Sequence, residues 1–140
     1  MKLIASILIV LFSVPFLSAQ INSDINAPEI TFQSEVIDFG NITQGSEAIR
    51  TFSFKNTGKT PLTIASIKGA CGCTTFPESW PKNPIAPGSS ANFKVKYDTS
   101  IRIGMFDKKI TVTSNASNSI VEVKIKGSVI PAGTPATSGN

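Results

Sequence analysis

The chain has 140 residues, with 13 Lys and Arg against 9 Asp and Glu, two Cys and no His. Without His it lacks the commonest general base and metal ligand, and every Ser-His or Cys-His nucleophile is excluded. The formal net charge of +4 is mild, and the sequence has no dense basic run and no aromatic-interleaved basic motif. We therefore expect neither an enzyme nor a nucleic-acid partner.

The first 19 residues have the layout of a secretory signal peptide. Lys2 precedes an apolar run over residues 3–17, and the small residues Ser18 and Ala19 stand just before the polar Gln20. A retained membrane anchor is the alternative, but the run is shorter than the roughly 20 residues that span a bilayer. We expect cleavage after Ala19, export, and no membrane span in the mature protein.

The composition of the remainder indicates one domain between two polar ends. Residues 20–28 are polar and end in Pro28, which predicts a flexible leader. Residues 131–140 are small, polar and rich in Pro and Gly, which predicts a flexible tail. Residues 29–130 lie between them, a length that suits a single domain.

Hydrophobic residues in this domain recur with a period of two, which is typical of half-buried antiparallel strands. Phe93, Val95 and Tyr97, for example, alternate with polar residues. The same pattern predicts seven short strands, at residues 30–33, 36–39, 50–55, 62–68, 91–98, 106–113 and 120–126. With no helical stretch between them, they predict an all-β fold, an immunoglobulin-like antiparallel β-sandwich, with a closed barrel as the alternative.

Irregular positions mark where these strands bend and turn. In residues 62–68, Leu62 and Ile64 share a parity that Ile67 breaks, which predicts a bulge or bend before Gly69. The connections carry turn residues. They are Asn56-Thr57-Gly58, which tolerates positive φ, and Pro87-Gly88, which fits a type II turn.

Cys71-Gly72-Cys73 is the only reactive constellation in the sequence. In a regular strand the two Cα atoms would lie about 6.6 Å apart, and Gly72 permits the bend that a disulfide of roughly 5.5–6 Å needs. Three hypotheses follow: a local disulfide or packed thiol pair that fixes the bend, a reducible disulfide with a redox role, and a copper site of two thiolates on Cu(I). Zinc is disfavoured because it usually takes four ligands. We expect no resident cofactor.

Several segments together resemble a known family. They include Phe52-Ser-Phe-Lys-Asn-Thr-Gly58 and Ala70-Cys-Gly-Cys-Thr74, and also residues 36–40, 44–45, 61–64, 85–88, 104–115 and 125–129. The chain resembles, over about residues 34–130, the bacterial family catalogued as domain of unknown function fifteen seventy-three. The resemblance implies an immunoglobulin-like sandwich, similar to major sperm protein and pilus-chaperone domains, in the periplasm or cell envelope of Gram-negative bacteria. It implies no established activity.

Three functional hypotheses remain. The first is a non-enzymatic envelope module that binds a protein or glycan through residues 69–88, where Phe76 and Trp80 stand beside Pro turns. The second is a thiol-redox or copper-binding protein that acts through Cys71 and Cys73. The third is a chaperone-like module that donates or accepts a strand, which requires a long unpaired sheet edge.

Three lysines of the last two predicted strands also call for an interpretation. Lys109, Lys124 and Lys126 are expected to share one solvent face. An anion-binding surface is one interpretation. We favour a solvated face that blunts edge pairing, as charged side chains on strands commonly do.

Overall fold

The computed structural model describes residues 24–133. The expected signal peptide, the first part of the leader and most of the tail lie outside the described residues, so those expectations stay predictions. The described end of the leader forms a turn, in which the Ala27 N–H donates to the Asp24 carbonyl at 2.9 Å, and Pro28 is buried. Within residues 24–133, no helix is long and apolar enough to cross a membrane.

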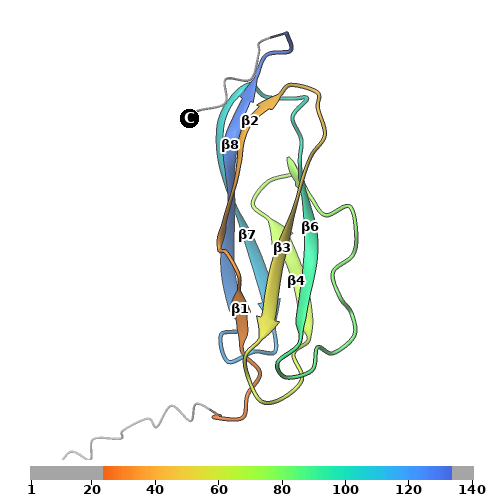
Figure 1. Cartoon of the computed structure of the whole chain (residues 1–140), viewed down its shortest axis with the longest axis vertical. Helices are drawn as coiled ribbons and strands as arrows, with labels where there is room; N and C mark the ends of the chain where they lie inside the picture. The colour runs from red at the N-terminus through yellow and green to blue at the C-terminus, as the bar shows by residue number, and fades with distance from the viewer. Residues whose placement is uncertain (1–23, 134–140) are drawn as a thin grey trace, which may run out of the picture.

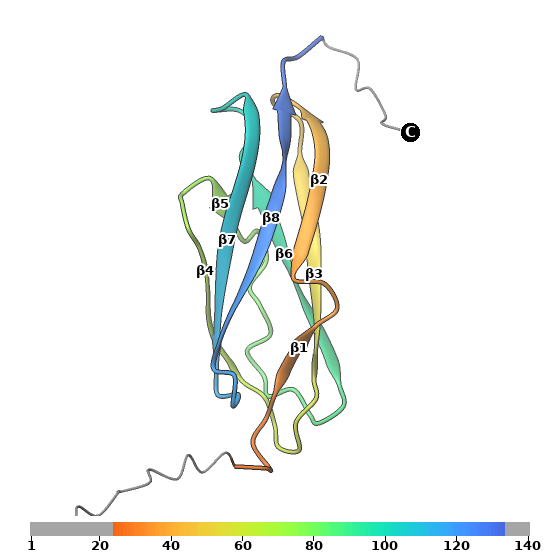
Figure 2. The ribbon, with the colours of Figure 1, turned by 90° about the vertical axis from the view of Figure 1, so that its left-hand side faces the viewer.

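Two four-stranded sheets lie face to face around one core (Figure 1, Figure 2). Sheet A has the order β1 (Ile30–Phe32), β3 (Ala48–Asn56), β6 (Ser90–Tyr97) and β5 (Thr74–Thr75). Sheet B has the order β2 (Val36–Thr43), β8 (Ile120–Ile130), β7 (Gly104–Ser114) and β4 (Ile64–Gly69). The predicted immunoglobulin-like sandwich is confirmed, and the closed barrel is wrong.

One pairing departs from the antiparallel pattern. β2 runs parallel to β8, with Val36 opposite Lys124, whereas the other strand pairs of the described residues are antiparallel. The chain crosses from sheet A to sheet B between β1 and β2 without reversing direction (Figure 2). β2 therefore cannot form a hairpin with its predecessor and adds to the last strand of the chain instead.

The inward side chains of both sheets form the core. Phe52 and Phe93 stack within sheet A, with ring centroids 5.4 Å apart. Tyr97 of β6 stacks on Phe106 of β7 with centroids 3.8 Å apart, so this aromatic pair joins the two sheets beside the β6–β7 connection. Burial of one such side chain stabilises the fold by about 1.5–3 kcal/mol.

One buried side chain organises the turn after β3. Asn56 is fully buried, and its Nδ2 donates to the carbonyl oxygens of Thr60 and Ile85 at 2.8 and 3.0 Å. Its Oδ1 accepts from the Gly58 N–H at 3.0 Å. The positive φ that we expected this turn to use is not found at Gly58. A Cβ there would instead lie 2.3 Å from the Ala27 carbonyl oxygen, so the glycine is needed for close backbone approach.

All seven predicted strands are present, and one more was not predicted. β4 begins at Ile64 rather than at residue 62, and the bulge predicted in this region lies between Ile64 and Ser66. The turn at Gly88 is confirmed by its φ of 78°. β5 was missed because two threonines are too short a segment to show a period.

Candidate functional site

Cys71 and Cys73 are joined by a disulfide in the turn between β4 and β5, with Cα atoms 5.3 Å apart. Backbone hydrogen bonds hold the turn on both flanks. The Ala70 N–H donates to the Lys109 carbonyl of β7 at 3.0 Å, and the Asp98 N–H beyond β6 donates to the Cys73 carbonyl at 2.8 Å. The redox role stays a prediction, and so does copper binding, which would need the reduced pair.

Gly72 has a smaller part in this turn than its place in the motif indicated. Its φ is not in the left-handed region, and a Cβ on Gly72 would meet no atom within 4 Å. An L side chain would therefore fit between the two cysteines. Gly69, at the end of β4, is the constrained glycine here, since a Cβ on it would lie 2.8 Å from Thr74 Cβ.

The disulfide lines a cavity of about 220 Å³. The residues that share it come from the turn, from the end of β6 with the following loop, and from β7. They are Cys71, Gly72, Cys73, Tyr97, Asp98, Ile101, Arg102 and Lys108. The site thus combines a disulfide with two cations and one carboxylate.

The charged side chains that line the cavity differ in whether they have hydrogen-bond or ion-pair partners. Asp98 Oδ1 accepts from the Ser100 N–H at 2.9 Å and from the Ser100 hydroxyl at 2.6 Å, and these hydrogen bonds lower the pKa of Asp98. Within residues 24–133, Arg102 and Lys108 form no ion pair with a carboxylate. Burial raises the pKa of Tyr97, which keeps its phenol neutral beside them.

A buried hydroxyl group reaches one of the two sulfurs. Thr74 is 5% exposed, and its Oγ1 lies 3.9 Å from Cys71 Sγ. Its own N–H donates to the Cys71 carbonyl at 3.2 Å, which fixes the side chain relative to the disulfide. Cys71 therefore has a hydrogen-bond donor beside its sulfur.

The predicted binding residues Phe76 and Trp80 lie in the connection after β5, both half-buried against the core. Phe76 packs edge-on against Phe93 with centroids 6.1 Å apart. Lys82 Nζ lies 3.6 Å from the centre of the Trp80 ring, and Trp80 Nε1 is buried without a hydrogen-bond partner. Both rings cover the core beside β6, and their role in partner binding stays a prediction.

Exposed apolar side chains gather instead in residues 101–105, which end the β6–β7 connection and begin β7 and are here called the apolar loop. Ile101, Ile103 and Met105 are 69%, 56% and 92% exposed. Ile101 and Arg102 line the cavity of the disulfide, so the start of the apolar loop lies beside the cysteine turn, whereas Met105 lines a separate hollow with residues of β2 and β8. Among the described residues only six large apolar side chains are exposed, and half of them fall in these five positions.

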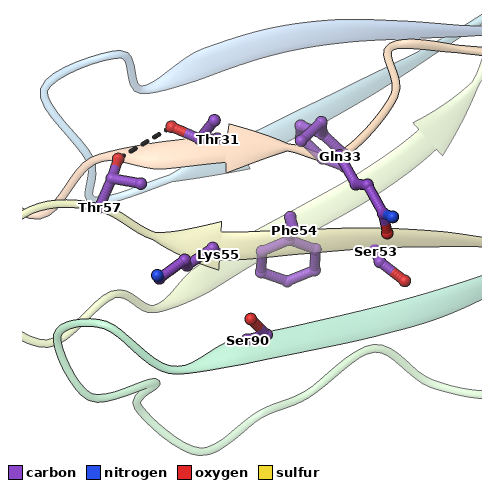
Figure 3. Close-up of a pocket in the computed structure, with 8 residues that line it drawn as sticks. Thr31, Gln33, Ser53, Phe54, Lys55, Thr57 and Ser90 are labelled. Carbon is purple, nitrogen blue, oxygen red and sulfur yellow. Dashed lines mark hydrogen bonds between the residues drawn. The ribbon is translucent and has the colours of Figure 1, made fainter.

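A larger hollow of about 470 Å³ lies on the outer face of sheet A, over β1, β3 and β6 (Figure 3). The hollow is lined mainly by small polar side chains, with Thr31 and Thr57 joined by a hydrogen bond of 2.8 Å between their hydroxyl groups. Lys55 is its one charged group, and Phe54 belongs to the core. This surface brings together no set of chemically reactive groups.

The three lysines that were expected to share a solvent face of sheet B each pair with a carboxylate. Lys109 pairs with Glu122 at 2.8 Å, and Lys124 pairs with Asp107 at 3.8 Å. Lys126 pairs in the same way with an aspartate of β2 at 3.5 Å. The interpretation of a solvated face is therefore favoured over an anion-binding surface.

The sequence matches the model of the family described as a protein of unknown function, DUF1573, over residues 30–129. The chain belongs to this family. The resemblance seen in the sequence is thereby confirmed, and the family has no assigned activity. No curated protein matches the chain.

Solved structures share the fold at low sequence identity. A protein of unknown function from Porphyromonas gingivalis W83 is 17% identical, with a TM-score of 0.63 over 75% of this chain and 48% of that one. This chain thus spans about half the length of that protein. A PapD-like domain of human CEP192 is 12% identical, with a TM-score of 0.56 over 94% and 99%. The Escherichia coli chaperone DraB is 12% identical, with a TM-score of 0.54 over 80% and 58%.

Sequence reasoning found the cysteines but not the groups that surround them. Arg102, Lys108 and Ile101 come from segments 30 or so residues away along the chain, and only the strand pairing brings them to the disulfide. One signal was present: Ile101, Ile103 and Met105 continue an alternating pattern outside the predicted strands. Apolar residues in a predicted connection mark a candidate interaction surface.

Proposed function

We propose that this protein is an exported recognition module of the cell envelope that binds an extended segment of another protein. The observation that carries the proposal is the apolar loop, with three exposed apolar side chains in five residues, the first of which lines the cavity of the disulfide. Exposed apolar groups in one place commonly mark interaction sites, and loops on a rigid sandwich commonly carry recognition. Export rests on the signal-peptide layout of residues 1–19.

The chemistry of the apolar loop favours a polypeptide over a glycan. Ile101, Ile103 and Met105 offer aliphatic and thioether surface with no hydrogen-bonding side-chain groups, and Met adapts readily to varied apolar partners. Arg102, between the two isoleucines, adds a donor for carbonyl oxygens. A segment with alternating apolar side chains would match this arrangement.

Strand exchange of the chaperone type has less support, because the sheet edges are short or irregular. β1 has three residues and β5 has two. β2 is bulged between Asp38 and Asn41, and β4 is bulged near its start. Bulges and short strands are devices that prevent pairing with another chain.

The remaining edge, along β6, is flanked by the chain itself. The connection between β5 and β6 runs beside β6 (Figure 1), and Lys94 of β6 pairs with Glu78 of this connection at 2.6 Å. A donated strand would have to displace this segment together with the half-buried rings of Phe76 and Trp80. We therefore place recognition at the apolar loop.

Charge-introducing variants test this assignment. Ile103→Asp and Met105→Asp are compared with Ile120→Asp, since Ile120 is similarly exposed (66%) but lies at the start of β8, far from the cysteine turn along sheet B. A photo-crosslinker at position 105, in cells, should capture an envelope protein that is then purified for affinity measurement. We expect the affinity to fall about tenfold for the two loop variants, the loss of one buried apolar side chain, and to hold for Ile120→Asp. Equal affinities for all three variants would refute the assignment.

A further inference from the structure

The Cys71–Cys73 disulfide connects nothing that is distant in the chain. The two residues are separated by only two positions. Their turn is already held by the backbone bonds from Ala70 to Lys109 and from Asp98 to Cys73. Because the stabilisation by a disulfide increases with the length of the loop that it closes, a loop this short gains less than most. Its placement therefore calls for another explanation.

The surroundings suit a sulfur that carries negative charge. Arg102 and Lys108 line the same cavity and have no carboxylate partner within residues 24–133, so their two positive charges outweigh the single negative charge of Asp98, which Ser100 keeps ionised. Cations beside a cysteine stabilise its thiolate. Thr74 Oγ1, at 3.9 Å, can donate to Cys71 Sγ. The disulfide itself carries no charge. The two cations and the Thr74 hydroxyl group can therefore stabilise a thiolate only when the disulfide bond opens.

The apolar loop supplies what a substrate segment needs beside this bond. Ile101 lines the cavity, and Ile103 and Met105, the latter at the start of β7, are the next exposed apolar side chains along the chain. A polypeptide bound there would pass next to the half-exposed cysteine turn. The occupant is thus an extended segment with apolar side chains, and a thiolate on it would face the two cations.

We infer that Cys71 and Cys73 form an exchange-active disulfide that oxidises a pair of reduced cysteines in an exported polypeptide bound at the apolar loop. The inference rests on the proposed function, because the docking surface is the same. In the first step a partner thiolate attacks Cys73 Sγ, a mixed disulfide forms, the Cys71–Cys73 bond breaks, and its electron pair goes to Cys71 Sγ beside Thr74. In the second step the partner's other thiolate attacks the mixed disulfide and releases Cys73. The partner loses two electrons and two protons, and Cys71 and Cys73 take them up as a dithiol.

Two reduced probes separate the chemistry from the docking. Dithiothreitol has no apolar segment, whereas a short peptide with two cysteines flanked by Leu and Val imitates the substrate. The folded protein is mixed with each probe, quenched by alkylation and weighed by mass spectrometry. We expect both probes to reduce the pair under native conditions. Cys71→Ala should give a protein in which Cys73 forms a mixed disulfide with an oxidised form of the peptide.

Rates of reduction in variants separate the contribution of the apolar loop from that of the nearby cations. Met105→Asp should slow the peptide about tenfold and leave dithiothreitol unchanged, with Ile120→Asp as the matched control. Lys108→Gln should slow both probes about threefold, the scale of one screened surface charge, with Lys55→Gln as its control. A pair that reacts only in denaturant would overturn the inference, and so would equal rates in Lys108→Gln and Lys55→Gln.

The same materials distinguish failure of this inference from failure of the proposed function. A peptide with both cysteines replaced by serine reports binding alone. If it binds at the apolar loop while the disulfide stays inert in the native protein, recognition stands and the exchange inference is overturned. If dithiothreitol reduces the pair while neither peptide binds, the apolar loop is not the docking surface. The inference that the substrate is a bound polypeptide is then overturned.

Discussion

Removal of the disulfide measures how much of the fold depends on it. The variant Cys71→Ala/Cys73→Ala deletes a crosslink between residues two positions apart. For a closed loop of about three residues, the chain-entropy relation gives a stabilisation of about 1.6 kcal/mol, compared with about 3 kcal/mol for a loop of 15 residues. At roughly 4 °C per kcal/mol for a domain of this size, the melting temperature should fall by about 6 °C.

Urea unfolding followed by circular dichroism measures this loss. The denaturation midpoint should move while the slope of the free energy against urea stays the same, because a crosslink over about three residues changes the surface exposed on unfolding very little. Reduced wild-type protein serves as the control and should unfold at the midpoint of the variant. A loss above about 4 kcal/mol, or a change in slope, would show that the crosslink is a structural staple. The reasoning behind the exchange-active site would then be refuted.

Four further measurements test other parts of the structure. Asn56→Ala should lower the free energy of unfolding by about 2 kcal/mol in urea titrations, because the part-buried Thr60 carbonyl and Gly58 N–H lose their side-chain partner and the Ile85 carbonyl keeps only the Leu62 N–H. Gly58→Ala should reduce the yield of folded protein or cost more than about 3 kcal/mol, since its Cβ would lie 2.3 Å from backbone, whereas Gly72→Ala should change stability by less than about 1 kcal/mol. Lys109→Ala should change it by less than about 1 kcal/mol, because its ion pair with Glu122 is exposed. Stability should be nearly constant from pH 5 to 8 in a chain without His. It should then decrease in acid, since Asp98 has a pKa lowered from 3.8, so its contribution is present above that value and is lost as the pH falls through the folded-state pKa.

The pattern of apolar residues was enough to predict most of the fold. Alternation such as Phe93, Val95 and Tyr97 places one face of a strand in the core, and this is a local property that the sequence displays directly. The bulge near Ile64 was visible for the same reason, as a break in parity. The parallel pairing of β2 with β8 was not predictable, because it depends on where the chain crosses between the sheets.

The candidate site also has features that the sequence could predict and features that it could not. The sequence by itself determined the cysteine pair, the exclusion of histidine chemistry and the family. Only the tertiary structure decided what surrounds the pair. It places Arg102 and Lys108 at the disulfide, leaves Met105 exposed and leaves Trp80 half-buried. The physical reason is that secondary structure follows from periodicity between near neighbours. The neighbours of the disulfide, in contrast, are set by the long-range pairing of β4 with β7 and of β5 with β6.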